Sequence, residues 1–416
     1  MPEARFAFAP FPAQVAFFRR KLNVPSARWD DLLRADHAHG FMVAGLARAD
    51  VLEDMRRAVA DAIARGETLA DFRARFEQIV QGRWEGWTGS GSARGRAWRT
   101  RIIYQTNLRT SYMAGRWETL QRFPYLRYQH NTVLNPREAH QAWDGRIIAR
   151  EDPWWDAHYP PNGWGCRCTV SGVSAQRLAQ LRGNTGPDTA PARIRNDPPA
   201  EWAYHVGAAA RSLPAAAAFG QKLMQLPPAW RAIALADAQA RRVDWFRDWE
   251  GFVRQTAIDS AANAARTQGK ATPVGFLAHD LIGRLESGTA TDGRKFTPVT
   301  PSTALLAVTD RAIAHALRSD KWVGRSTQRA QIERALEQLP AWIANAPLVL
   351  LDFSQADSVL AFATPVAGGE FDVVYVRLDQ REKRAAQPVQ AGWVRTVERR
   401  SAQSLRGMRV LRGAMP

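Results

Sequence analysis

Hydrophobic spacing changes twice along this chain, so a single repeating architecture cannot account for all of it. From Phe11 to about Arg122 the apolar residues recur mostly three or four positions apart, which predicts amphipathic helices. Up to Cys168 the pattern then turns irregular and extended, and it is dense in tryptophan, proline and glycine. After Thr272, helical patterns precede short runs rich in β-branched and aromatic residues, which are typical of strands. This order predicts a multidomain α+β protein, α-rich at its N-terminal end and closing with helices and an antiparallel sheet.

The length of the chain supports the same division. A chain of 416 residues exceeds one hydrophobic core, because domains typically hold roughly 100 to 200 residues. The composition shifts to alanine, proline and polar residues from Ala175 to about Leu226, and a helical segment follows near Asp237 to Gln268. We therefore predict an N-terminal module over residues 1–174, a connector with a helical segment over 175–254, and an α+β domain over 255–416.

Secondary structure in the C-terminal domain can be predicted segment by segment. Its hydrophobic pattern changes from helical spacing to β-branched and aromatic runs. Helices are expected around Gly275–Leu285, Ser302–Trp322 and Thr327–Ala344. Strands are expected at Leu348–Phe353, Ser358–Thr364, Phe371–Leu378 and Trp393–Val397.

The charge balance of the chain implies a polyanionic partner. Lysine and arginine number 57 against 40 acidic residues, which gives a formal net charge of +17 and a sequence pI near 10.8. Such a field favours nucleic acid through counterion release, without saying which nucleic acid is bound. A genome-wide bias toward arginine and alanine would produce the same composition, so charge alone does not decide whether the surface faces DNA.

Cysteine usage and apolar runs exclude two classes of protein. Two cysteines are the whole inventory, which excludes a disulfide framework of the secreted kind. The N-terminus lacks a basic region followed by an apolar core, and no window approaches the roughly 18 apolar residues needed to cross a bilayer. We expect a protein of cytosolic origin that is neither secreted nor membrane-spanning.

The most distinctive sequence motifs in the chain lie between His140 and Cys168. They read HQAWDG, then DPWW, then PPNGWGCRC, and a helical segment with YQTNLRT at residues 104–110 precedes them. This order of parts, over roughly residues 50–172, resembles the Mu F family of phage head-morphogenesis proteins. The positions that carry the motif are His140, Asp144, Gly145, Pro161, Gly163, Trp164, Cys166 and Cys168.

The resemblance implies a minor capsid protein of a tailed phage. Proteins of that family are found in few copies near the portal, where head assembly and the path of the DNA meet. The implied partners are portal and capsid proteins and phage DNA. The implied location is the virion, in the head interior or beside the portal, and the host cytoplasm during assembly.

The Cys-x-Cys pair allows two interpretations. Zinc accepts cysteine and histidine ligands, so Cys166 and Cys168 could form a metal site with His140 or His158. Structural zinc sites usually draw ligand pairs two to four residues apart, which favours two small buried thiols and no cofactor. A disulfide within the pair would close a very small, strained ring.

Four neighbouring tryptophans are expected to pack with prolines into a local core: Trp143, Trp154, Trp155 and Trp164.

The C-terminal domain carries a second order of motifs. It reads VGFLA at residues 274–278, then DRAIAHALRSDK at 310–321, then Leu-Pro ahead of the strand predicted at 348. Over about residues 272–410 this resembles the phage-associated nuclease-like families grouped with barnase, EndoU, colicin nucleases and RelE. The resemblance implies a helix bearing His-x-x-Arg-x-x-Lys, here His315, Arg318 and Lys321, followed by a small antiparallel sheet.

Helix geometry supports a clustered polar face in that segment, because Arg311, His315 and Arg318 lie at i, i+4 and i+7. RNA cleavage by transesterification needs a base, an acid and a cation for the developing charge, and it needs no metal. Arg377 at the end of a strand and Thr396 in the last strand are further catalytic candidates. The same residues also fit an ordinary basic helix face, a charge on an edge strand and a strand threonine.

Three functions remain open at this point. The residues favour a structural head protein, because the His140 to Cys168 segment offers no evident nucleophile. The first alternative is a virion-delivered, metal-independent RNase effector that acts on host RNA and has an immunity protein as partner. The second alternative is a metal-dependent enzyme centred on His140 and the cysteine pair.

Overall fold

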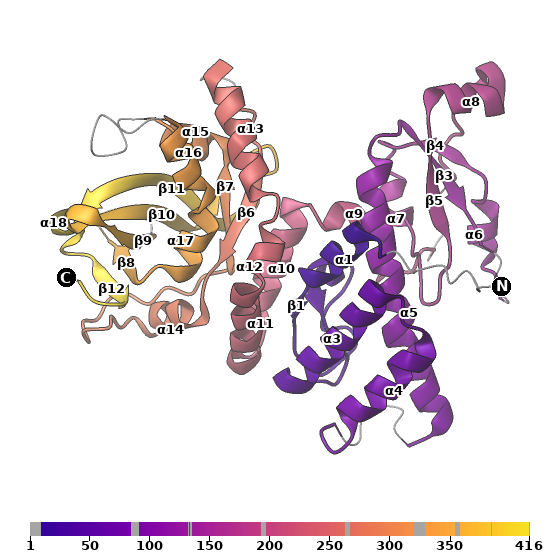
Figure 1. The fold of residues 1–416 in the computed structure, drawn as a ribbon, viewed down its shortest axis with the longest axis horizontal. Helices are drawn as coiled ribbons and strands as arrows, with labels where there is room; N and C mark the ends of the chain where they lie inside the picture. Colours follow the sequence, from indigo (N-terminus) through magenta and orange to yellow (C-terminus); the bar gives the residue numbers. More distant parts are fainter. Residues whose placement is uncertain are drawn as a thin grey trace, which may run out of the picture. The chain divides into compact units, whose positions relative to one another are not determined.

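A computed structural model describes residues 10–84, 91–131, 133, 135–192, 197–262, 267–318, 329–353, 358–383 and 385–415 (Figure 1). The chain forms two compact units, Met1–Ser212 and Leu213–Pro416. Helices dominate the first unit and a large sheet organises the second, so the multidomain α+β prediction is confirmed. The predicted connector, residues 175–254, contains helices on both sides of this division.

Helices build the N-terminal half of the first unit. They are α1 (Pro12–Arg19), α2 (Asp36–His39), α3 (Ala49–Arg65), α4 (Leu69–Val80) and α5 (Ala93–Leu120), with a short parallel pair of strands, β1 (Leu22–Asn23) and β2 (Gly40–Phe41). A capping box between Thr68 and Asp71 begins α4, and Gly66 ends α3 in the left-handed conformation. The 28 residues of α5 make a rod of about 42 Å that contacts α1, α3 and α4.

A three-stranded antiparallel sheet forms the other half of the first unit. Its strand order is β4 (Ile147–Ala149), β3 (Tyr125–Gln129), β5 (Thr169–Val173). The short helices α6 (Glu138–Ala142) and α7 (Trp155–His158) lie in the connections between strands, and α8 (Ala175–Arg182), the 3-10 turn η1 (Gly183–Thr185) and α9 (Val206–Ala209) follow β5. The last pair of the β3–β5 register joins Gln129 to Thr169. This register places His130 and Cys168 at the same end of the sheet.

The second unit is organised around a seven-stranded mixed sheet in the order β12-β8-β9-β10-β11-β7-β6. Its strands are β6 (Ala271–Phe276), β7 (Leu305–Thr309), β8 (Leu348–Asp352), β9 (Val359–Val366), β10 (Glu370–Arg381), β11 (Gln390–Ser401) and β12 (Arg409–Arg412). Neighbouring strands are antiparallel except for the parallel pair β7 and β11. The four predicted strands are therefore confirmed, although the sheet is mixed and gains β6, β7 and β12.

Helices surround this sheet, and two of the helical predictions are wrong in part. The helices are α10 (Leu213–Gln225), α11 (Pro228–Ala240), α12 (Arg242–Trp245), α13 (Trp249–Ala262), α14 (His279–Ser287), α15 (Asp310–Ala316), α16 (Arg329–Glu337), α17 (Leu339–Asn345) and α18 (Ala402–Leu405). The stretch predicted as helical from Ser302 begins instead with β7, whose five residues are all buried. The stretch predicted as helical from Gly275 begins within β6. A continuous apolar run fits a doubly buried strand as well as a buried helix, so spacing alone could not separate them.

Within the described part of the chain, no helix combines the length and the apolar character that crossing a bilayer requires.

Candidate functional site

Aromatic side chains give the region between β3 and β5 a core of its own. Trp143 is 1% exposed, and its ring meets Tyr128, Trp154 and His158 edge-to-face at centroid distances of 5.6, 5.4 and 5.0 Å. Trp155 is buried as well and meets Trp154 at 5.0 Å. The expected tryptophan core therefore exists for three of its four proposed members.

Trp164 lies outside that core, which corrects the sequence-based expectation. Its side chain is 43% exposed and contacts only Trp202 among the aromatic rings of the described residues. The loop turns outward here because Gly163 and Gly165 adopt positive φ angles of 153° and 70°. Arg137 fixes the loop by donating a hydrogen bond to the Trp164 carbonyl at 2.9 Å.

The other motif residues hold the connection between β3 and β4. The Asp144 carboxylate accepts a hydrogen bond from the backbone N–H of His130 at 2.8 Å. Gly145 adopts a φ of 76° and donates its backbone N–H to the Tyr128 carbonyl at 3.0 Å. Asp144 and Gly145 therefore bring the chain after α6 back to the end of β3.

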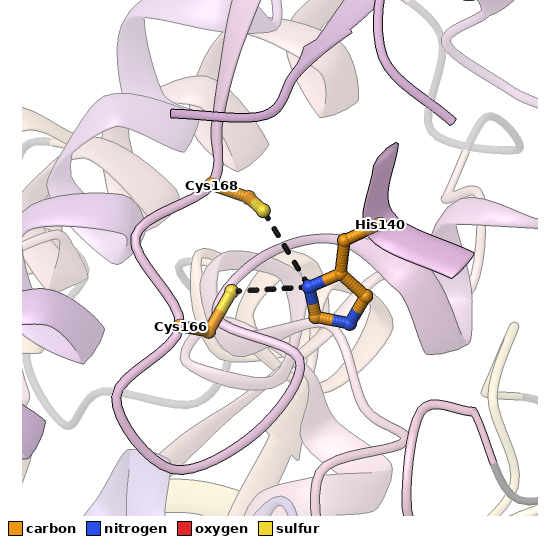
Figure 2. Close-up of side chains that lie close together, drawn as sticks. All are labelled: His140, Cys166 and Cys168. Atoms are coloured by element: carbon orange, nitrogen blue, oxygen red, sulfur yellow. Dashed lines mark hydrogen bonds between the residues drawn. The ribbon is translucent and has the colours of Figure 1, made fainter. Parts of the chain in front are cut away.

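His140, Cys166 and Cys168 meet in the buried interior of this region (Figure 2). The Nδ1 atom of His140 lies 3.8 Å from Cys166 Sγ and 3.5 Å from Cys168 Sγ. His140 comes from α6, whereas both cysteines precede β5. All three residues are at most 4% exposed. The structure thus brings together the three residues that the sequence offered as a possible metal site.

Two further side chains complete this cluster. Nδ1 of His130 lies 3.4 Å from Cys168 Sγ. On the other side of the His140 ring, Nε2 lies 3.2 Å from an Asp197 carboxylate oxygen. Neither His130 nor Asp197 stood out in the sequence, because one follows an ordinary strand and the other lies in a segment read as connector.

The surroundings of the cluster shift the pKa values of its two thiols in opposite directions. A hydrogen bond with Cys168 lowers the pKa of Cys166 well below its usual range, and His140 adds to this effect, whereas burial opposes it. The same hydrogen bond raises the pKa of Cys168, and burial adds to that shift. Both thiols are too deeply buried for a macromolecular substrate to reach, so the arrangement suits ligand holding better than nucleophilic attack.

A groove of about 270 Å³ lies beside the cysteine segment. Tyr104 to Arg109 on α5 form one wall, and Pro161 to Arg167 form another. The Arg109 guanidinium joins the walls by donating a hydrogen bond to the Cys166 carbonyl at 3.4 Å. The helical segment at residues 104–110 and the cysteine segment, which together carry the family resemblance, therefore lie side by side in the structure.

The second unit contains a larger cleft of about 600 Å³ on one face of its sheet. Tyr375 and Arg377 alternate with inward-facing residues on β10, and Thr396 lies opposite Tyr375 on β11. The Thr396 hydroxyl is buried and finds no hydrogen-bond partner within the described residues. Burial raises the pKa of Tyr375. Further residues lining the cleft include Arg395, Glu398, Arg400, Ser404 and Arg406.

The five catalytic candidates of the C-terminal domain fall into separate places. Arg377 and Thr396 share the cleft. Nδ1 of His315, on α15, lies 3.5 Å from the guanidinium of Arg318, a residue that follows the end of this helix. Neither residue lines the cleft. Lys321 lies outside the described residues. Tyr375, Arg395 and Arg400 are cleft residues that sequence reasoning missed, although strand alternation from Arg377 could have found Tyr375.

Comparison with known proteins points to one family. Residues 53–171 match the family model described as Phage Mu protein F like protein. The chain is 34% identical over 186 residues to the putative capsid assembly protein F of Escherichia phage Mu, an alignment that covers 40% of this chain and 41% of that protein. It is also 34% identical over 164 residues to the Mu-like prophage FluMu F protein of Haemophilus influenzae, covering 37% of this chain and 39% of that protein.

The alignments span about two-fifths of the length of each of these relatives. No solved structure matches the chain. The segment matched by the family model contains His130, His140 and both cysteines, and it ends before Asp197.

Proposed function

We propose that this chain acts in assembling the head of a tailed phage, as a minor capsid protein close to the portal and to the path of the DNA. The observation that carries the proposal is the match over residues 53–171, together with similarity to a putative capsid assembly protein. The matched segment runs from α3 to β5, so it includes the long helix, the small sheet and the cysteine cluster. The head-assembly role belongs to the first unit.

The test is incorporation into heads. We expect the chain to sediment with heads when it is coexpressed with the portal and major capsid proteins of the phage that encodes it, and to remain after a high-salt wash. Mass spectrometry of gradient-purified heads gives the measurement. A chain that stays at the top of the gradient while heads form normally would contradict the proposal.

The first unit also offers a surface suited to the DNA path. Arg94, Trp98 and Arg101 lie at i, i+4 and i+7 near the start of α5, and all three are exposed, Trp98 to 48%. Two guanidiniums flanking an aromatic ring can contact phosphates and stack on a base or sugar. The net charge of the whole chain, +17, would add long-range attraction for DNA to the contacts that this face can make.

We expect DNA binding to weaken steeply with salt, because each phosphate contact releases a counterion. Replacing both Arg94 and Arg101 with alanine should lower the slope of log affinity against log salt by about 2, roughly one for each lost contact. Arg254→Ala is the matched control, because that exposed guanidinium is already paired with Glu250 and Glu337. Fluorescence anisotropy over a salt series gives the slopes. A salt-independent affinity would rule out the DNA-facing role.

A second candidate function, RNA cleavage, concerns the C-terminal unit. The observation that favours it is the cleft on the sheet, where Arg377, Arg400 and Arg406 surround Tyr375 and the buried hydroxyl of Thr396. Guanidiniums suit bidentate phosphate contacts and can stabilise charge that develops on a phosphorane. Glu398 and Tyr375 supply groups able to transfer a proton. A head protein carrying this unit could deliver it to the host, with host RNA as substrate and an immunity protein as the inhibitor.

A further inference from the structure

We propose that His130, His140, Cys166 and Cys168 bind one zinc ion, which joins the segments after β3, at α6 and before β5. This site goes beyond head assembly, and neither its existence nor its loss decides that role. The donors are two thiols and two imidazoles, the ligands that structural zinc sites use most. The distances, the strand register and the surroundings of His140 support the site independently.

The spacing between donor atoms fits a tetrahedral zinc ion. Zinc–sulfur and zinc–nitrogen bonds of about 2.3 and 2.0 Å place neighbouring sulfur and nitrogen ligands about 3.5 Å apart at tetrahedral angles. The two His140–cysteine distances are 3.8 and 3.5 Å, and the His130–Cys168 distance is 3.4 Å. The donor atoms of His140 and the two cysteines all lie within 4.8 Å of one another. These three donors are already close enough to share an ion, whereas His130 lies beside Cys168 alone and must turn toward the other two to complete the shell.

The strand register explains how the fourth ligand reaches the site. Gln129 of β3 pairs with Thr169 of β5, so the next residues outward on the two strands are His130 and Cys168. Two hydrogen bonds hold this end in place, from the His130 backbone to Asp144 and from the Asn131 amide to the Arg167 carbonyl. Sequence spacing could not reveal this ligand, because His130 lies 36 positions before Cys166 and approaches it only through the sheet.

Asp197 orients the His140 ring for metal binding. Its carboxylate lies 3.2 Å from Nε2, which leaves Nδ1 directed at the two sulfurs. A ligand histidine that donates its other N–H to a carboxylate is the usual arrangement around protein-bound zinc, because it fixes the tautomer and the ring orientation. Trp143 supports the same orientation by stacking on the His140 ring at 5.1 Å and 21°.

The site has the features of a structural zinc site rather than a catalytic one. Four protein ligands fill a tetrahedral shell and leave no position for water or substrate. His140 and both cysteines are almost completely buried. Thiolates and imidazoles select zinc over magnesium or calcium, which prefer oxygen ligands. The ion would tie together segments that otherwise share only a three-stranded sheet and short helices.

The test is the metal content of the full-length chain, purified without chelators and then exposed to zinc. We expect about one zinc ion per chain, and a lower melting temperature after the metal is removed with a strong chelator. The Cys166→Ser, Cys168→Ser double variant, which changes volume little, should lose the zinc. Replacement of zinc by Co²⁺ should give the visible absorption of a tetrahedral cobalt–thiolate centre.

Single variants test the individual ligands. Asp197→Asn should weaken zinc affinity by about 10- to 100-fold while the ion still binds, because only the orientation of His140 changes. His130→Gln should weaken it at least as much. The control is His205→Asn, which replaces a buried histidine elsewhere in the unit and keeps the side-chain cap on α9. Affinities come from competition with a coloured chelator.

Three results would overturn the proposal. The first is wild-type chain that holds no zinc after exposure to the ion and keeps its melting temperature in the chelator. The second is a double serine variant that retains zinc as tightly as the wild type. Unchanged affinity in His130→Gln would remove His130 from the shell and with it the four-ligand site.

Discussion

Replacing Trp143 with alanine is expected to lower the free energy of unfolding of the Met1–Ser212 unit by about 3 to 5 kcal/mol. The ring is 1% exposed and sits between Tyr128, Trp154 and His158, with His140 stacked on its face. Its removal leaves a cavity that neighbouring aromatic rings cannot fill without losing their own edge-to-face contacts. Because this core supports the cysteine segment, head incorporation should fall with stability.

Trp164→Ala is the matched control for that prediction. It makes the same chemical change in the same region, but its side chain is 43% exposed and packs only on Trp202 among the described aromatic rings. We expect a loss of less than about 1.5 kcal/mol, in line with surface or partly exposed positions. Urea unfolding of both variants, at saturating zinc, gives the comparison. Equal losses would show that Trp143 does not hold the core.

Arg377→Ala is expected to lower metal-independent RNA cleavage by about two to three orders of magnitude, the usual cost of removing a charge-stabilising donor. The wild-type chain should cleave total RNA in EDTA, because transesterification needs no metal and the proposed zinc site lies in the other unit. Arg284→Ala on α14, an exposed arginine that does not line the cleft, serves as control. Cleavage rates on a labelled RNA, with matched circular dichroism, give the measurement.

His315→Ala tests the sequence-based assignment separately. Loss of proton transfer there would cost about two to four orders of magnitude. His315 contacts Arg318 and does not line the cleft, so we expect this variant to retain most of the activity. If His315→Ala loses most of the RNA cleavage rate and Arg377→Ala keeps it, the reaction takes place at α15 and not in the cleft. A wild-type chain inert on RNA would leave the unit as a binding appendage.

The sequence predicted the fold class and the later strands because their signals are local. Val359–Val366 and Glu370–Arg381 carry β-branched residues in runs that extended backbone favours. Leu305–Thr309 was missed because a strand buried on both faces shows no alternation. The parallel pairing of β7 with β11 depends on contacts between distant segments, which no local pattern records.

The candidate site could be predicted only where its parts lie close together in the sequence. The cysteine pair and His140 were recognisable, but their spacing favoured buried thiols without a metal. His130 enters through the register of β3 with β5, and Asp197 enters through a long connection. In the second unit, Arg377 and Thr396 line one cleft although they lie on different strands, whereas His315 lies elsewhere. Tertiary geometry, rather than residue type, made the difference in each case.

Separating the two units tests which of them carries the head-assembly role. Met1–Ser212 and Leu213–Pro416 would each be coexpressed, as tagged fragments, with the portal and major capsid proteins of the phage that encodes the chain. We expect gradient-purified heads to contain the first fragment at the copy number of the full chain and to lack the second. Heads that incorporate Leu213–Pro416 and exclude a folded Met1–Ser212 would contradict this expectation.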